Sequence, residues 1–153
     1  GLTISLAESC TGGLIAQLLT DQPGASAFLE RSIVSYANTA KTDCLKVKQE
    51  ILDRYGAVSP EGAEAMANGV RSAARTDISL AVTGIAGPDG GTADKPVGTV
   101  YLAMISPQGE RVERFNFSGN REQVRLRTAC TALDWLRRQA MAQLSGGILE
   151  DEA

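Results

Sequence analysis

The stretch Leu2-Thr3-Ile4-Ser5-Leu6-Ala7-Glu8-Ser9-Cys10-Thr11-Gly12-Gly13 decides the fold, because it leads a short apolar strand into a helix through a turn rich in hydroxyl groups and glycine. The apolar run 2–7 is typical of a strand, and residues 14–19 have the apolar pattern of a helix. Backbone N–H groups at such a helix start favour an oxyanion or a phosphate. The alternative is that Ser9 or Thr11 only caps the helix.

Short β-branched segments alternate with helical segments along the rest of the chain, which predicts an α/β fold. We predict strands at residues 2–7, 29–36, 78–83, 98–105 and 111–117, and helices at 12–20, 39–45, 48–54, 60–75 and 121–143. The last two strands are close enough to form an antiparallel hairpin, whereas helices join the earlier ones. The predicted architecture is a three-layer α/β/α sandwich with a mixed, mainly parallel central sheet of about five strands.

Composition excludes several classes of function. The 153 residues fit a single domain, which we place at 1–144, followed by a frayed acidic tail at 145–153. A net charge of −3 with scattered basic residues argues against nucleic-acid binding, and no apolar run is long enough to cross a membrane. The three cysteines form no Cys-x-x-Cys pair and the chain has no histidine, so we expect reduced thiols in a cytoplasmic protein, with no metal and no cofactor.

A glycine-rich connection, residues 83–91, follows the third predicted strand. It is neither a dinucleotide fingerprint nor a Walker loop, because no Gly-Lys-Ser/Thr opens a helix. Glycine lets a ligand approach the backbone closely, so Thr83, Gly84 and Gly87 are candidates for the rim of a pocket. A plain surface loop is the alternative.

Two further helix starts carry basic residues. Asn38 is a good N-cap for the helix that contains Lys41, which then falls at the third helical position, where the helix dipole disfavours its charge. Lowering a lysine pKa to near neutrality also requires desolvation. Asn120 precedes Arg121 and Arg125, which lie on one helix face and can bind a phosphate, and Arg121 is the candidate ligand. Surface ion pairing with Glu122 or Asp134 is the alternative, which is favoured more for Arg125 than for Arg121.

Without histidine, a serine nucleophile needs a lysine, a carboxylate or a tyrosine as its proton carrier. Ser9, Tyr36 and Lys41 form one possible set. Cys10 as a thiolate at a helix start and Glu8 as a base are the alternatives.

Six blocks, taken together and in order, resemble the CinA C-terminal domain family, the nicotinamide mononucleotide deamidases. They are Ala-Glu-Ser-Cys-Thr-Gly-Gly at 7–13, Ser-Tyr-Ala-Asn-x-Ala-Lys at 35–41, Gly-Ala-Val-Ser at 56–59, Thr-Gly-Ile-Ala-Gly-Pro-x-Gly-Gly at 83–91, Lys-Pro-Val-Gly-Thr-Val at 95–100 and Gly-Asn-Arg at 119–121. One departure is Asn120, where the family commonly has aspartate. Many members carry a second, N-terminal domain, so we expect a stand-alone type or an excised domain.

The resemblance implies hydrolysis of the nicotinamide mononucleotide carboxamide to nicotinic acid mononucleotide and ammonia, in pyridine nucleotide salvage. It also implies that Ser9 is the nucleophile of a Ser-Tyr-Lys triad with Tyr36 and Lys41. We take the N–H groups of Thr11, Gly12 and Gly13 as candidates for the oxyanion hole. The expected partner is a small nucleotide, and we expect a homo-oligomer. A non-catalytic nucleotide-binding or interaction module and an amidase with another carboxamide substrate stay open as alternatives.

Overall fold

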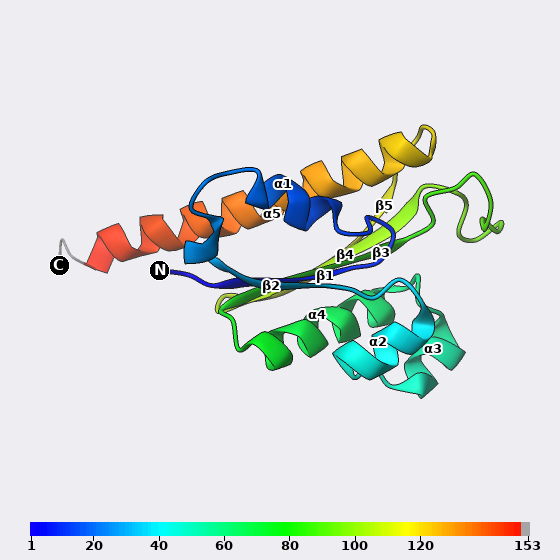
Figure 1. Cartoon of the computed structure of the whole chain (residues 1–153), viewed down its shortest axis with the longest axis horizontal. Helices are drawn as coiled ribbons and strands as arrows, with labels where there is room; N and C mark the ends of the chain where they lie inside the picture. Colours follow the sequence, from blue (N-terminus) through cyan, green and yellow to red (C-terminus); the bar gives the residue numbers. More distant parts are fainter. Residues whose placement is uncertain (151–153) are drawn as a thin grey trace.

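A computed structural model describes the backbone of residues 1–150 and the side chains of residues 1–146. The protein is built on one five-stranded sheet with the order β2-β1-β3-β4-β5 (Figure 1). The strands are β1 (Ile4–Glu8), β2 (Leu29–Val34), β3 (Ile78–Gly84), β4 (Thr99–Ser106) and β5 (Gly109–Asn116). Each lies within a few residues of its predicted bounds.

The sheet is mixed, as the sequence predicts. β1 runs parallel to both β2 and β3, and β4 is antiparallel to β3 and β5, so four strands share one direction and β4 opposes them. Ser106 pairs with Gly109, which closes the β4–β5 hairpin through a two-residue loop. The carboxyl ends of β1, β2, β3 and β5 therefore meet at one edge of the sheet, where α/β proteins bind ligands.

Helices cover both faces of the sheet and complete the three layers (Figure 1). On one face lie α1 (Leu14–Thr20) and α5 (Arg121–Glu150), and on the other lie α2 (Asn38–Leu45), α3 (Gln49–Tyr55) and α4 (Pro60–Ala74). A short 3-10 helix at Ala25–Ala27, which we did not predict, precedes β2. The start of α4 follows its sequence pattern, because Ser59 accepts a hydrogen bond from Gly62 N–H and Pro60 takes the first helical position.

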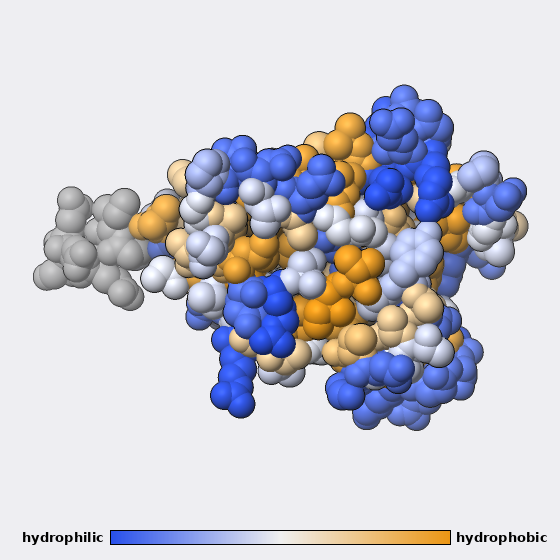
Figure 2. All heavy atoms as spheres, viewed as in Figure 1, coloured by the Kyte–Doolittle hydropathy of each residue, from blue (hydrophilic) through white to orange (hydrophobic). Residues whose placement is uncertain are grey.

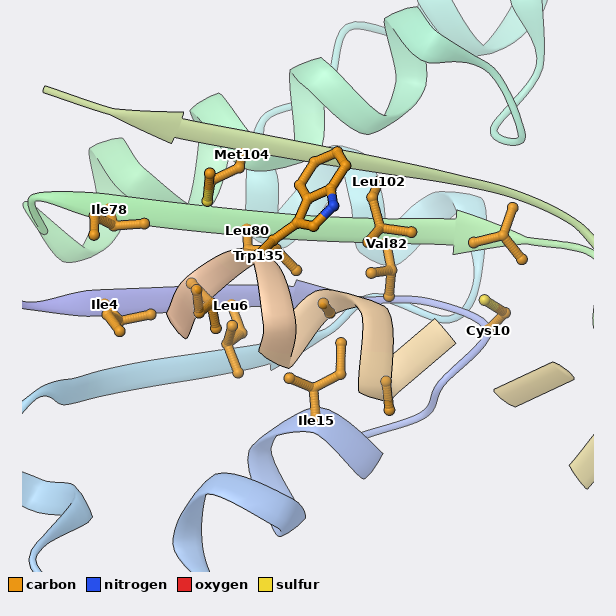
Figure 3. Packing of buried hydrophobic residues seen from close by; sticks show 14 of the residues in the cluster. Ile4, Leu6, Cys10, Ile15, Ile78, Leu80, Val82, Leu102, Met104 and Trp135 are labelled. Atoms are coloured by element: carbon orange, nitrogen blue, oxygen red, sulfur yellow. The ribbon is translucent and has the colours of Figure 1, made fainter. Parts of the chain in front are cut away.

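Two apolar cores hold the layers together. One packs strand side chains such as Leu80 and Leu102 against Ile15 of α1 and Trp135 of α5 (Figure 3). The other packs Met66 and Val70 of α4 against the opposite sheet face. Apolar residues also gather near the middle of the molecular face in Figure 2, among polar ones. No helix in the described part of the chain is long and apolar enough to cross a membrane.

Two sequence predictions need correction. We predicted a frayed tail over 145–153, but α5 continues through Glu150, and residues 151–153 lie outside the described part. We also predicted Asn38 as the cap of α2, but Asn38 is the first helical residue and Ala37 occupies the N-cap without a side-chain hydrogen bond. Lys41 is therefore the fourth helical residue rather than the third.

Candidate active site

Glu8, the last residue of β1, organises the turn that carries Ser9. Its fully buried carboxylate accepts hydrogen bonds from the N–H groups of Ile15 and Ala16, at 2.9 and 3.1 Å, and from the Thr11 hydroxyl at 2.7 Å. The Ser32 hydroxyl is 3.2 Å from the same carboxylate. Glu8 therefore caps α1 from the preceding strand, and the alternative in which Ser9 or Thr11 only caps the helix is wrong. With its oxygens engaged in this way, Glu8 is unsuited to act as a base.

Lys41 lies directly against the Ser9 side chain. Lys41 Nζ is 3.1 Å from Ser9 Oγ, 2.7 Å from the carbonyl oxygen of Ser35 and 3.2 Å from that of Tyr36. The contact exists because β1 and β2 are parallel neighbours, so Ser9 and the residues that lead into α2 emerge at the same sheet edge. Two of the three predicted catalytic residues, Ser9 and Lys41, are therefore in direct contact.

The lysine is almost completely enclosed, with 1% of its surface exposed. Burial lowers the pKa of Lys41, because a low-dielectric surrounding disfavours the ammonium form. We predicted contributions from both the helix dipole and desolvation, and desolvation is the cause that lowers the pKa of Lys41 here. The site therefore contains an amine that loses its proton more readily than a surface lysine, next to a serine hydroxyl.

Tyr36 is oriented differently from its two predicted partners. Its phenol oxygen accepts a hydrogen bond of 2.8 Å from Arg121 Nη2, and the side chain is largely exposed. Within residues 1–146, no hydrogen bond joins the phenol to Ser9 or Lys41; Tyr36 reaches Lys41 only through its backbone carbonyl. Arg121 also donates to the Gly87 carbonyl at 2.9 Å, so it links the tyrosine to the glycine-rich loop.

These residues line a pocket of about 280 Å³ at the carboxyl edge of the sheet. Ser9, Tyr36, Lys41 and Arg121 all contribute to its wall, together with the predicted rim residues Thr83, Gly84 and Gly87. Four further lining residues, Ile85, Ala86, Asp89 and Gly90, belong to the predicted rim segment 83–91, and Cys10 was considered as a nucleophile. Sequence reasoning did not assign the remaining lining residues to the site; they are Asn38, Ala57 and Val58. Most of these follow strands or precede helices, a position that could have suggested them.

The predicted oxyanion donors lie elsewhere. Thr11, Gly12 and Gly13 do not line the pocket, and Thr11 is fully buried with its hydroxyl on Glu8. The Gly12 N–H is also engaged, because it donates to the carbonyl of Ser9 at 3.0 Å. The Thr11 hydroxyl and the Gly12 N–H are therefore used within the turn that leads into α1.

Cys10 does not have the properties of a nucleophile. Its side chain packs into the core that also contains Val82 and Leu102 (Figure 3). Desolvation raises the pKa of the thiol to about 12, so the reactive thiolate is scarce at neutral pH. The alternative in which Cys10 replaces Ser9 is therefore disfavoured.

Arg125 differs from the sequence prediction. Surface ion pairs with Glu122 or Asp134 were the alternative favoured for Arg125, but its guanidinium donates to the backbone carbonyls of Cys10, at 3.2 Å, and Thr11, at 2.8 Å. Asp134 pairs instead with Arg137 and Arg138. The preceding Asn120 caps α5 as expected, by accepting from the Gln123 N–H at 2.9 Å.

A larger cavity, of about 680 Å³, lies between the first residues of the chain and the later part of α5. Apolar side chains such as Leu2, Phe28 and Leu136 line it, with Arg137 at its edge. Among its described lining residues, no nucleophile is paired with a base. The candidate catalytic groups therefore lie in the smaller pocket around Ser9.

Comparison with known proteins agrees with this fold and this arrangement of motifs. A family model described as CinA C-terminal domain matches residues 1–140. The chain belongs to this family. A CinA-like protein from Syntrophotalea carbinolica is 63% identical over 138 residues, and one from Geotalea uraniireducens is 55% identical over 150 residues. These matches cover 90% and 98% of the chain but only 34% and 36% of the two relatives, so the chain spans about a third of their length.

Solved structures of the family have the same fold. The competence/damage inducible protein CihA from Agrobacterium tumefaciens is 46% identical with a TM-score of 0.88, and the match covers 92% of this chain and 86% of that one. The competence damage-inducible protein A from Klebsiella pneumoniae is 35% identical, also with a TM-score of 0.88, covering 92% of this chain and 88% of that one.

Proposed function

We propose that the protein is an amidohydrolase that converts nicotinamide mononucleotide to nicotinic acid mononucleotide and ammonia, in pyridine nucleotide salvage. The substrate is the one that the family resemblance implies. The observation that carries the proposed chemistry is the contact between Ser9 Oγ and the buried Lys41 Nζ at 3.1 Å. A serine beside a lysine with a lowered pKa is a known arrangement for acyl transfer without histidine.

The surroundings of Lys41 suit a base. A neutral amine has two hydrogens and one lone pair, and the carbonyls of Ser35 and Tyr36 are placed to accept the two hydrogens. The lone pair then points toward the Ser9 hydroxyl. In the ammonium form, the third hydrogen would be donated to Ser9 Oγ, so the same geometry accommodates both protonation states.

The reaction then has two steps. Ser9 Oγ attacks the carboxamide carbon while Lys41 takes the hydroxyl proton, and the resulting ammonium returns that proton to the amide nitrogen, which leaves as ammonia. Water next attacks the acyl-serine ester, with Lys41 again as the base, and releases the carboxylic acid and Ser9. Because Lys41 contacts Ser9 directly, the phenol of Tyr36 is not needed for proton transfer, and we assign Tyr36 to binding at the pocket rim.

Arg121 is the proposed phosphate ligand. It stands at the first position of α5, where helix N–H groups add a positive field, and two of its nitrogens are already oriented by Gly87 and Tyr36. A guanidinium held in this way retains further N–H groups for a phosphate.

The test is ammonia release from nicotinamide mononucleotide, nicotinamide riboside and nicotinamide, measured side by side. We expect release from the mononucleotide, its loss in Ser9→Ala, and its persistence in Cys10→Ala, which removes the thiol but keeps the backbone. Absence of ammonia from all three compounds would overturn the proposed reaction. Equal rates with all three would retain an amidase but remove its selectivity for the mononucleotide.

A further inference from the structure

The turn between β1 and α1 is held from two sides by groups of opposite charge. Glu8 accepts from donors of the turn and of α1, whereas Arg125, on α5, donates to the carbonyl oxygens of Cys10 and Thr11. Arg125 is half-buried and does not line the pocket. Arg125 therefore contacts the turn that carries Ser9 and not a ligand in the pocket.

The hydrogen bonds of the turn determine where its peptide groups point. The C=O and N–H of a trans peptide point in opposite directions. The Ser9 carbonyl faces the Gly12 N–H inside the turn, so the N–H of the same peptide, which belongs to Cys10, points out of the turn. The Ser9 N–H itself is used by the Val82 carbonyl at 3.1 Å.

Cys10 is also the residue of this turn that reaches the pocket beside Ser9. Its thiol is buried and packs in the core (Figure 3), so the backbone is the part of Cys10 that we assign to a ligand. A backbone N–H immediately after a nucleophile is well placed to stabilise the oxyanion that forms when that nucleophile attacks a carbonyl.

We infer that the Cys10 N–H is the oxyanion donor of this site and that Arg125 is the positioning residue that keeps it aimed. This inference rests on the proposed acyl transfer to Ser9. Arg125 fixes the next two carbonyls along the chain, and this restrains rotation of the preceding peptide group, which carries the Cys10 N–H. The guanidinium of Arg125 contacts the turn and does not contact the substrate.

The experiment compares Arg125→Ala and Arg125→Lys with Arg138→Ala, a matched control on the same helix whose partner is the exposed Asp134. We expect kcat for ammonia release to fall about 10–100-fold in Arg125→Ala with little change in KM. This is less than the roughly 10²–10³-fold loss on removing an oxyanion donor, because the Cys10 N–H stays present but is less well aimed. Arg125→Lys should recover only part of the rate, because lysine has one terminal nitrogen and cannot replace both the Nε and the Nη2 of Arg125, which bond the two carbonyls. Added guanidinium ion at low millimolar concentration should raise the rate of Arg125→Ala and of no other variant.

A second measurement separates this inference from the choice of substrate. The rate at which phenylmethanesulfonyl fluoride modifies Ser9, followed by intact mass, should fall in Arg125→Ala and stay unchanged in Arg138→Ala, whether or not the mononucleotide is hydrolysed. A normal kcat and a normal labelling rate in Arg125→Ala would overturn the inference. So would a loss explained by unfolding alone, seen as a lowered melting temperature with kcat restored on cooling and no response to guanidinium.

Discussion

Lys41 Nζ lies 3.1 Å from Ser9 Oγ although the two residues are 32 positions apart in the sequence. The lysine is enclosed, and its other two neighbours are backbone carbonyls. This relationship gives the pocket a nucleophile and a base in direct contact, and the tests below depend on it.

Replacing the base should remove most of the turnover. In Lys41→Met we expect kcat to fall by about 10²–10⁴-fold, the usual contribution of a general base. Methionine fills similar space and removes a buried charge, so the melting temperature should shift by no more than about 4 °C. Steady-state kinetics and thermal unfolding of the same preparation check both values. An unchanged kcat would exclude Lys41 from the proton path.

The rate should increase with pH. Lys41 must be neutral to accept the Ser9 proton, and burial places its folded-state pKa below 10.5, its ordinary value. We therefore expect kcat/KM to rise as pH increases through that lowered pKa and then to level off. The burial of the ammonium also costs stability at pH values below the folded-state pKa, and this cost disappears as pH rises toward 10.5. A rate that does not vary with pH would contradict the assignment.

Tyr36→Phe distinguishes a Ser-Lys pair from a Ser-Tyr-Lys triad. Because the phenol bonds to Arg121, we expect less than about a tenfold loss of kcat, far smaller than the general-base effect. KM should rise instead, since Arg121 loses one of the groups that orient it. A loss of kcat as large as in Lys41→Met would place the phenol in the proton path.

Arg121→Ala tests recognition of the phosphate. Loss of hydrogen bonds to a charged group costs about 1.5–3 kcal/mol, so KM for the mononucleotide should rise about 10–100-fold. KM for the riboside, which has no phosphate, should change much less. The exposed Arg138→Ala is the control. Equal effects on both compounds would mean that Arg121 acts by shaping the pocket.

Glu8→Gln tests the cap of α1. An amide would place an NH₂ group against N–H or O–H donors that now bond to the carboxylate. We expect the free energy of unfolding to fall by about 1–3 kcal/mol, measured by urea denaturation. Glu64→Gln, the same change at an exposed position of α4, should shift it by less than about 0.5 kcal/mol. Unchanged stability in Glu8→Gln would show that the carboxylate does not hold the turn.

Much of the fold follows from local sequence. The strand β3 and the helix α4 were predicted within one residue, because apolar periodicity and the Ser59-Pro60 start depend on residues close together in the chain. The start of α2 was missed by one residue, since Ala37 and not Asn38 takes the N-cap. The end of α5 was missed because Ser145-Gly146-Gly147 is typical of a chain end, yet the helix continues through it.

The sequence by itself determined the α/β layering, the strand-turn-helix around Ser9 and, through the resemblance, which residues to examine. Only the tertiary structure decided their partners. The parallel pairing of β1 with β2 brings Lys41 into contact with Ser9. Packing of α5 beside the turn that follows β1 lets Arg125 donate to the Cys10 carbonyl, and Arg121 at the start of α5 donates to the Tyr36 phenol. Local propensity cannot specify such contacts, because they depend on strand order, register and burial, which the whole chain sets at once.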